Sequence, residues 1–404
     1  MRKEALYYLV IVTILFTCYR TMPIPKTNKI FSRKTLHLDN LLSHALSNNP
    51  RVSANNAIVK AMELRAKRAR LPQDPKFKYQ SKDNEHLGQC LFKRERRYGI
   101  YQKVPFPGKL KLKKEIKLQN AAFIASNREE EVLELILKLK TLYYELYIAH
   151  FVKNIKKQNK TKISNVLTTI NNKKVRLHAH IKIQKIQEGI HALEGEQKSI
   201  ETNINALLNQ QLSTYLGTPK PIFHEKITFD INKLEALALK NRPDIAGHSA
   251  LIIKHEKRAK LARRNYFPDF DLEFIIQRKK DYDRYAWYVK IGFDIPIWAR
   301  QKQKRESDES ECMALARKLE LQNLRNKIMG NIRSLVLEIQ ALNKNISLYK
   351  KEIIPAAEKI LELEKSSINA IIELQEENIY HEKLLVKREI LLAKLEKQVG
   401  IPLF

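Results

Sequence analysis

The sequence predicts a mainly helical, exported membrane protein built from two similar halves, each containing one β-hairpin. Three observations support this mixed α/β fold class. The chain has only 10 glycines in 404 residues and long stretches without Gly or Pro, which favours long helices. Two segments in the two halves share a sequence pattern. Two stretches of the second half alternate apolar and polar residues with the period of a β-strand.

Residues 1–22 have the layout of a secretory signal peptide. Arg2 and Lys3 precede an apolar run from Ala5 to Phe16, which is too short to span a bilayer. No A-x-A cleavage motif follows the run, so three outcomes stay open: a cleaved signal, an uncleaved anchor, or a lipoprotein-type signal that places a lipid on Cys18. We expect the chain to be exported.

An internal repeat organises the rest of the chain. When residues 38–77 are aligned without gaps to residues 231–270, identical residues coincide along the whole segment. The coincidences include Asn48 with Asn241, Pro50 with Pro243, the Arg-Ala-Lys triplet at 65–67 with that at 258–260, and Pro75 with Pro268. We predict a first repeat at 36–217, a Pro-containing linker at 218–228 and a second repeat at 229–400. Each repeat would hold a helix, a strand hairpin and a long helical hairpin.

The second half carries the clearer strand hairpin. Its apolar face would hold Phe270, Leu272, Phe274, Ile276, Trp287, Val289, Ile291 and Phe293, and its polar face would hold Asp271, Glu273, Lys290 and Asp294. In a soluble protein the apolar face would pack in a core. A strand of about ten residues equally suits a tilted transmembrane strand with one lipid-facing and one lumen-facing side. Because the chain has an export signal, we predict lipid-facing residues in the first set and lumen-facing residues in the second.

The first half has a weaker hairpin, with Phe77 and Tyr79 on one strand and Tyr98 to Val104 on the other. A charged loop is predicted from Ser81 to Arg97. Two hairpins cannot close a useful barrel, and an open sheet edge in lipid leaves backbone groups unpaired. Several chains must therefore contribute strands, and we expect an oligomer.

Apolar residues at heptad spacing predict coiled-coil helices after each hairpin. The seams run through Val132 to Leu146, Ile186 to Leu207 and Leu335 to Tyr349. The first helical hairpin would turn at Asn171, Asn172 and Lys173 and give two helices of roughly fifty residues. The second would turn at Ser366, Ser367 and Asn369, and Pro355 inside it should kink the helix.

The sequence contains no recognisable catalytic or cofactor motif. The three cysteines lack zinc-site spacing, and no metalloprotease, serine-hydrolase or phosphate-loop pattern occurs. We therefore expect no enzyme activity, no metal and no cofactor. We interpret His178 and His180 as surface histidines, and Cys312 as a packing residue.

The formal net charge of +31 raises the question of a nucleic-acid partner. The Lys and Arg residues are spread through the helical segments with Glu among them, and aromatic residues are not interleaved with them. We interpret them as solvated helix faces and expect no nucleic acid as a partner.

Several motifs, in this order along nearly the whole chain, resemble those of the TolC-like outer-membrane efflux protein family. They are the LxxALxxNP helix ending in Asn49-Pro50, PFPGKL from Pro105 to Leu110, NRPDI from Asn241 to Ile245, ARRNYFPDF from Ala262 to Phe270, IPIW from Ile295 to Trp298, Leu348-Tyr349 before Ile354-Pro355, and the closing Val399-Gly400. The PFPGKL form is most similar to members paired with heavy-metal-resistance pumps.

The resemblance implies a homotrimer in which each chain gives four strands to one twelve-stranded β-barrel, continued by a periplasmic tunnel of coiled-coil helices. It implies a passive export channel for small substrates in the outer membrane of a Gram-negative type bacterium. The implied partners are outer-membrane lipid, a periplasmic adaptor (membrane fusion) protein and an inner-membrane pump of the RND or a similar type.

The sequence departs from the family pattern at the two tip turns. Family members usually have a glycine in each turn, but residues 168–175 and 365–371 contain none, and no acidic ring is found there from the sequence. An alternative function is a periplasmic coiled-coil adaptor or scaffold, which explains the heptads but not the alternating hairpins. A nucleic-acid-binding coiled coil would not explain the export signal.

Overall fold

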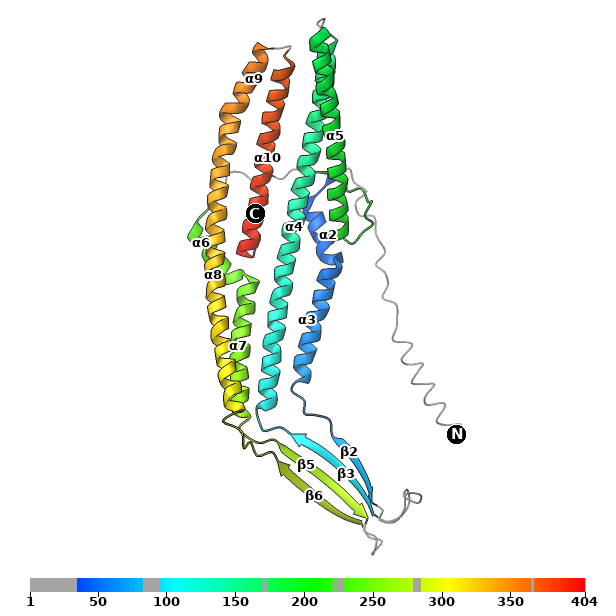
Figure 1. Cartoon of the computed structure of the whole chain (residues 1–404), viewed down its shortest axis with the longest axis vertical. Coiled ribbons are helices and arrows are strands. Elements are labelled where there is room, and N and C mark those ends of the chain that lie inside the picture. The colour runs from blue at the N-terminus through cyan, green and yellow to red at the C-terminus, as the bar shows by residue number, and fades with distance from the viewer. Residues whose placement is uncertain are drawn as a thin grey trace, which may run out of the picture.

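The computed structural model describes residues 35–82, 95–168, 173–220, 223, 229–278, 285–364 and 367–403. The molecule is elongated, with a β-sheet at one end and long helices that run away from it (Figure 1). The first half contains β1 (Thr35–Leu36), α2 (Leu38–Asn48), α3 (Pro50–Arg68), β2 (Lys76–Lys82), β3 (Glu95–Val104), α4 (Lys109–Leu167) and α5 (Lys173–Leu207). The second contains β4 (Thr218–Pro219), α6 (Ile231–Asn241), α7 (Pro243–Arg264), β5 (Phe270–Arg278), β6 (Tyr285–Phe293), α8 (Gln303–Leu348), a π-helical segment (Tyr349–Ile353), α9 (Ile354–Leu363) and α10 (Ile368–Val399).

The order of two short helices, two strands and one arm of long helices therefore occurs twice along the chain. Both short helix pairs break at an Xaa-Pro step, Asn49-Pro50 and Arg242-Pro243. Proline fits the first turn of a helix, where its missing N–H has no helical partner, and it pushes the preceding residue out of the helical conformation. The two halves thus share an element order, and the duplication itself stays a prediction.

The long helices, with α3 and α7, form a single layer, and the short helices α2 and α6 pack against it. Near the sheet the neighbours are α3, α4, α7 and α8, and farther away they are α5, α4, α10 and α8 with α9. Helix α4 therefore runs through both sections, as does the continuous arm of α8 and α9 (Figure 1). The heptad seams lie in the helix contacts, since Leu139, Ile190 and Ile339 are all buried.

The sheet has four strands in the order β2-β3-β5-β6, and all neighbouring strands are antiparallel. The pairing of β3 with β5 joins the two halves of the chain. Strands β2 and β6 stand at the two edges of this sheet. A separate short pair, β1 with β4, is parallel and lies alongside the helices.

Two apolar cores lie about midway along the molecule, one for each half. The first packs α2 against α4 and α5 through residues such as Leu41, Leu146 and Ile204. The second packs α6 against α8 and α10 through residues such as Ala238 and Ile332. The Tyr143 hydroxyl lies 2.5 Å from the Lys220 carbonyl oxygen and fastens the β1-β4 pair to α4. Burial raises the pKa of Tyr143 to about 12.

Several predicted boundaries are corrected by the structure. The two helices of the first arm have 59 and 35 residues rather than about fifty each. Helix α5 ends early because the Asn205 amide donates to the carbonyls of Leu212 and Thr214, and Asn209 adopts a positive φ of 55°. These bonds turn the chain before Leu216.

The predicted loop from Ser81 to Arg97 is also too long. Ser81 pairs with Arg96 and Gln80 with Arg97, so both strands extend into it; residues 83–94 lie outside the described residues. Polar residues at the strand ends gave no alternating signal, yet β3 is held there by two neighbouring strands.

Pro355 is preceded by the five-residue π-helical segment, and both proline and a π-helical segment are usual sites of a kink; the expected kink stays a prediction. One further expectation is corrected. Cys312 is exposed, so the interpretation as a packing residue is wrong. The first two residues of the predicted linker form β4. The predicted signal segment with Cys18 lies outside the described residues.

Candidate membrane-facing sheet and helical tips

The sheet has one apolar face that is exposed among the described residues. Residues directly paired across antiparallel strands point to the same side of a sheet. The register therefore builds two apolar rows across all four strands: Phe77, Ile100, Phe274 and Val289, and Tyr79, Tyr98, Ile276 and Trp287. At the two edges Phe77 is 70% exposed and Trp287 71% exposed. A contiguous exposed apolar surface of this kind is typical of a membrane or protein interface.

All eight residues predicted to face lipid lie on this apolar face. The register places Leu272 opposite Ile291 and Phe270 opposite Phe293, in line with the two rows above. From the first half the face also receives Val104, which pairs with Phe270. Assignment of this face to lipid stays a prediction.

The opposite face of the sheet is polar and its charges are paired across strands. Lys78 Nζ lies 2.9 Å from Glu273 Oε1, and Lys103 Nζ lies 3.0 Å from Asp294 Oδ2. The Tyr101 hydroxyl donates to Asp271 at 2.5 Å. The register also puts Lys290 on this side, opposite Glu273. The four residues predicted to face a lumen are therefore brought together, with Asp294 one residue beyond the end of β6.

A large apolar residue is buried on the polar face, which the alternation did not reveal. Ile275 is only 7% exposed there, and its cross-strand neighbour is Gly99. A Cβ added at Gly99 would lie 3.5 Å from both Glu273 Oε1 and Ile275 Cγ1. The glycine therefore leaves the space in which Ile275 and Glu273 pack.

The sheet is joined to the helices by a buried ion pair. Lys109 begins α4 and its side chain is 6% exposed; its Nζ lies 2.7 Å from both Asp269 Oδ1 and the Phe267 carbonyl oxygen. The same Asp269 oxygen accepts from the backbone N–H of Phe106. Burial would raise the pKa of Asp269, but its hydrogen bonds to Lys109 and Phe106 and the positive charge of Lys109 lower it.

The PFPGKL and PDF motifs therefore have a shared structural role at this junction. Gly108 has a φ of 90°, and its position lies against Arg264, whose Nε donates to the Pro107 carbonyl oxygen. The rings of Phe106 and Phe267 stack with centroids 4.7 Å apart. Lys109 and Asp269 were not predicted as partners, although both stood in motifs that the sequence analysis singled out.

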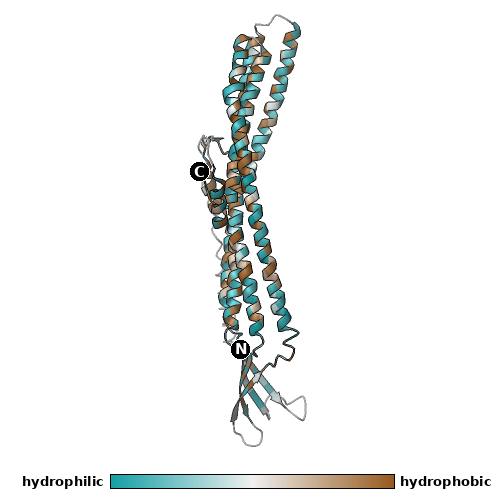
Figure 2. Ribbon diagram, turned by 90° about the vertical axis from the view of Figure 1, so that its left-hand side faces the viewer, coloured by the Kyte–Doolittle hydropathy of each residue, from teal (hydrophilic) through white to brown (hydrophobic). Residues whose placement is uncertain are grey.

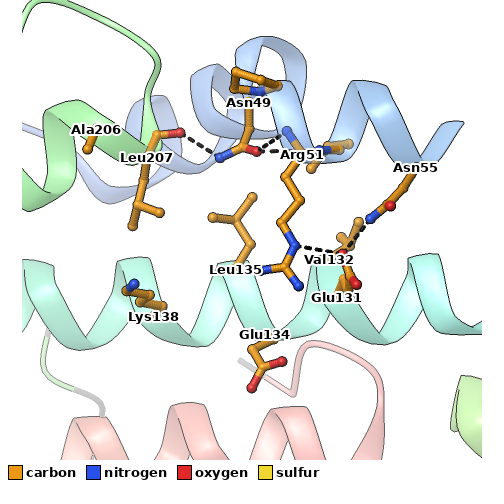
Figure 3. Close-up of a pocket in the computed structure, with 12 residues that line it drawn as sticks. Asn49, Arg51, Asn55, Glu131, Val132, Glu134, Leu135, Lys138, Ala206 and Leu207 are labelled. Atoms are coloured by element: carbon orange, nitrogen blue, oxygen red, sulfur yellow. Dashed lines mark hydrogen bonds and ion pairs between the residues drawn. The ribbon is translucent and has the colours of Figure 1, made fainter. Parts of the chain in front are cut away.

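A groove of about 510 Å³ lies midway along the molecule between α3, α4 and the end of α5 (Figure 3). Asn49 stands at its upper rim: its Oδ1 accepts from the Arg51 and Val52 N–H groups, and its Nδ2 donates to the Leu207 carbonyl oxygen at 2.8 Å. One side chain thus caps α3 and closes the last turn of α5. Arg51 pairs with Glu131 at 2.9 Å, and this hydrogen bond lowers the pKa of Glu131.

Arg242 occupies the corresponding place in the second half. It is buried, makes two hydrogen bonds to Asp244, and donates to the carbonyl oxygen and side chain of Gln398 near the end of α10. Asn49 in the first half and Arg242 in the second therefore each link the break between two short helices to the end of a long helix, α5 or α10.

The two helical arms meet at their far ends through a small apolar cluster. Ile163 and Ile183 of the first arm pack with Ile368 and Ile372 of the second. Lys182 Nζ also donates to Asn369 Oδ1. A groove of about 450 Å³ lies beside this contact and is lined by residues that include His178 and Lys182.

The predicted tip residues are placed at or next to these ends. Lys173 is the first residue of α5, and Ser367 caps α10 by accepting from the Ala370 N–H at 3.4 Å. Asn369 lies in the first turn of α10. Asn171, Asn172 and Ser366 lie outside the described residues.

The two tips carry opposite charges. Residues 153–168 and 173–185 of the first arm contain ten Lys and Arg and no acidic residue. Residues 354–364 and 368–382 of the second arm contain seven Glu and one Lys. The far end of the second arm is therefore acidic alongside a basic first arm. The contrast is not apparent at the tip turns themselves, because the Glu residues are divided between two helices.

The described helices include no segment that is long and apolar enough to cross a membrane. Apolar residues instead occur as stripes among polar ones along each helix (Figure 2). Among the described residues, no group of three or more His, Cys, Asp and Glu could hold a metal ion.

Three solved structures of similar architecture are those of an outer membrane protein and of two proteins described as channels. CusC, described in connection with transmembrane channel formation, is 16% identical, with a TM-score of 0.75 over 90% of this chain and 92% of that one. The open state of the MtrE outer membrane channel of Neisseria gonorrhoeae is 14% identical, with a TM-score of 0.75 over 91% and 89%. The outer membrane protein VceC of Vibrio cholerae is 14% identical, with a TM-score of 0.72 over 91% and 97%.

The chain has the fold of these outer-membrane channels. The fold that the resemblance to TolC-like proteins implied for one chain is thereby confirmed. The sequence matches no protein-family profile and no curated protein. At such low identity, the similarity to these channels lies in the arrangement of strands and helices and not in the sequence.

Proposed function

We propose that the chain is the channel subunit of an outer-membrane efflux duct that exports small substrates passively. Three copies would each give the four strands β2, β3, β5 and β6 to a twelve-stranded barrel, with the helical arms forming a periplasmic tunnel. A periplasmic adaptor and an inner-membrane pump of the RND or a similar type would engage the helical end. The protein would be located in the outer membrane of a Gram-negative type bacterium and would act without enzymatic chemistry.

The observation that carries this proposal is the chemical difference between the two faces of the sheet. In a closed barrel the exposed apolar rows would face lipid, and the paired charges of Glu273 and Asp294 would line a wet lumen. Closure would also pair the edge strands β2 and β6 with strands of neighbouring copies, which removes unsatisfied backbone groups from the membrane.

The alternative, a periplasmic coiled-coil adaptor or scaffold, accounts for the helical arms but leaves the apolar face without a function. The PFPGKL motif predicts a heavy-metal branch. Because Gly108 and Lys109 of this motif have structural roles at the junction, the motif gives no structural evidence for a substrate. The heavy-metal assignment therefore rests on the resemblance alone.

A matched pair of arginine substitutions tests the membrane assignment. Phe274→Arg and Val289→Arg place a charge on the apolar face, whereas Tyr288→Arg places it on the opposite face of the same strand. Burying Arg at the lipid face costs about 2–4 kcal/mol near the bilayer midplane. We expect the first two variants to lose trimers from the outer-membrane fraction and ion conductance in planar bilayers, and Tyr288→Arg to retain both.

If all three variants assemble and conduct equally, the apolar face does not contact lipid and the channel proposal fails. A native protein that is a soluble monomer would also contradict it, and would favour the adaptor.

A further inference from the structure

The positive charge of the chain is concentrated where the helices meet the sheet. Four short segments at these helix ends, residues 65–70, 111–117, 257–264 and 300–305, contain seventeen Lys and Arg and one acidic residue, Glu115. The near end of each segment is six or seven residues from a strand, at the sheet end of α3, α4, α7 or α8 (Figure 1). We call the Lys and Arg residues of these four segments the basic belt. They account for about half of the net charge of +31.

The basic belt contains a groove of about 490 Å³ between α4 and α7. Its lining includes Lys111, Lys257, Lys260 and Arg264, with Phe267 at the end next to the sheet. Lys257 is engaged by Glu115 at 2.7 Å. Lys111 and Lys260 are exposed and form no ion pair with any described residue. The groove thus offers free ammonium groups beside an exposed aromatic ring.

The position of the basic belt relative to the apolar face specifies its partner. The apolar rows end toward the helices with Val104, Phe270 and Phe293, which pair in one line across β3, β5 and β6. The belt begins only a few residues farther along the chain. Lys and Arg immediately outside a membrane-spanning segment are attracted to anionic headgroups, and the attraction decays within a Debye length.

We propose that the basic belt binds the anionic phospholipid headgroups of the leaflet that faces the helical arms. This inference rests on the proposed function, because it requires the apolar face to lie in a bilayer. Phosphate groups would bind between Lys111 and Lys260, while Phe267 and Trp298, both exposed, would lie at the level of the glycerol backbone. Within the belt, Lys257 pairs with Glu115 and Arg263 pairs with Glu311, and Glu306 directly follows the last basic segment.

The test compares the purified protein in vesicles of phosphatidylcholine alone and in vesicles that also contain phosphatidylglycerol. The measured quantity is the temperature at which the assembled oligomer dissociates. We expect phosphatidylglycerol to raise this temperature for the native protein. The belt variant Lys111→Gln, Lys113→Gln, Lys260→Gln, Lys304→Gln should lose most of the increase while behaving as native in phosphatidylcholine, since these four residues are exposed and form no ion pair with any described residue.

The control variant removes the same charge at the far end of the helical arms: Lys157→Gln, Lys162→Gln, Lys173→Gln, Lys185→Gln, all exposed. Lys111 and Lys162 are about 75 Å apart along α4, so the control should keep the full increase. Salt at about 1 M, where the Debye length is about 3 Å, should abolish the increase in the native protein.

Equal increases in the native protein and the belt variant would overturn the proposal, as would no increase in the native protein. An equal increase produced by inorganic phosphate in pure phosphatidylcholine would assign the groove to free phosphate and overturn the lipid assignment. Failure of the channel proposal is seen separately, as the absence of an oligomer in pure phosphatidylcholine.

Discussion

The connection made by Asn49 should stabilise two helix ends at once, and its removal can be quantified. Asn49 is buried and links the start of α3 to the Leu207 carbonyl oxygen of α5. Replacing an N-cap asparagine by alanine costs about 1 kcal/mol, and losing a buried hydrogen bond costs about 1 kcal/mol more. We therefore expect Asn49→Ala to destabilise this region by about 2 kcal/mol.

Hydrogen exchange is the suitable assay because it resolves local opening at individual helix ends. Amides in the last turn of α5 depend on the bond to Leu207, which contributes about 1 kcal/mol, so they should exchange about 5-fold faster in Asn49→Ala. Asn49→Asp retains an acceptor for the α3 cap but cannot donate to Leu207. It should therefore accelerate exchange in α5 while leaving the start of α3 protected.

The neighbouring Asn48 supplies the control. Its amide donates only to the His44 carbonyl oxygen and the Ser47 hydroxyl within its own helix, so Asn48→Ala should change protection at the end of α5 by less than about 0.5 kcal/mol. Equal acceleration by Asn48→Ala and Asn49→Ala, or full protection in Asn49→Asp, would refute the assigned role of Asn49.

Two other predictions concern packing and pH. A Cβ at Gly247 would lie 2.9 Å from Ser126 Cβ, whereas one at Gly330 has nothing within 4 Å; Gly247→Ala should therefore cost about 1–3 kcal/mol by separating α4 from α7. Gly330→Ala should gain about 0.5–1 kcal/mol of helix stability, and urea titrations of both variants measure the two effects. Equal changes in stability for Gly247→Ala and Gly330→Ala would contradict the close packing at Gly247. Burial, helped by Lys153, lowers the pKa of His150 from 6.5 to about 4, so its contribution is complete above pH 6.5 and is lost as pH falls toward 4. Because the ring is partly exposed, we expect a loss of about 1–2 kcal/mol between pH 6.5 and pH 4. Urea midpoints at these two pH values should show a smaller acid loss in His150→Gln than in the native protein. An equally large loss in the variant would contradict this reasoning.

Local patterns predicted the strands and turns of this chain well. Alternation placed Phe274 and Glu273 on opposite faces, and the Asn-rich stretch predicted the end of the first helical arm. The pairing of β3 with β5 was not predicted, because Tyr98 and Ile276 are far apart in sequence and no local pattern specifies which strands become neighbours.

The parts that sequence reasoning missed depend on contacts between distant residues. Ile275 is buried on the polar face because Gly99 of another strand leaves space there. The early end of α5 depends on the amide of Asn205, and the junction depends on Lys109 reaching Asp269. Each of these residues was visible in the sequence, but its partner was fixed only by the fold.

Because the sheet has two open edges, the stability of the proposed barrel would depend on the concentration of the protein. Strands β2 and β6 have no second neighbour in the described sheet, and the apolar rows between them are exposed. Such a chain offers templates for wrong pairing as well as for correct closure. In the proposed barrel, the folded state of each chain would by mass action depend on the concentration of other copies. A copy whose β6 edge could not pair would then occupy intact chains in incomplete rings, and one defective gene product would depress assembly out of proportion to its abundance.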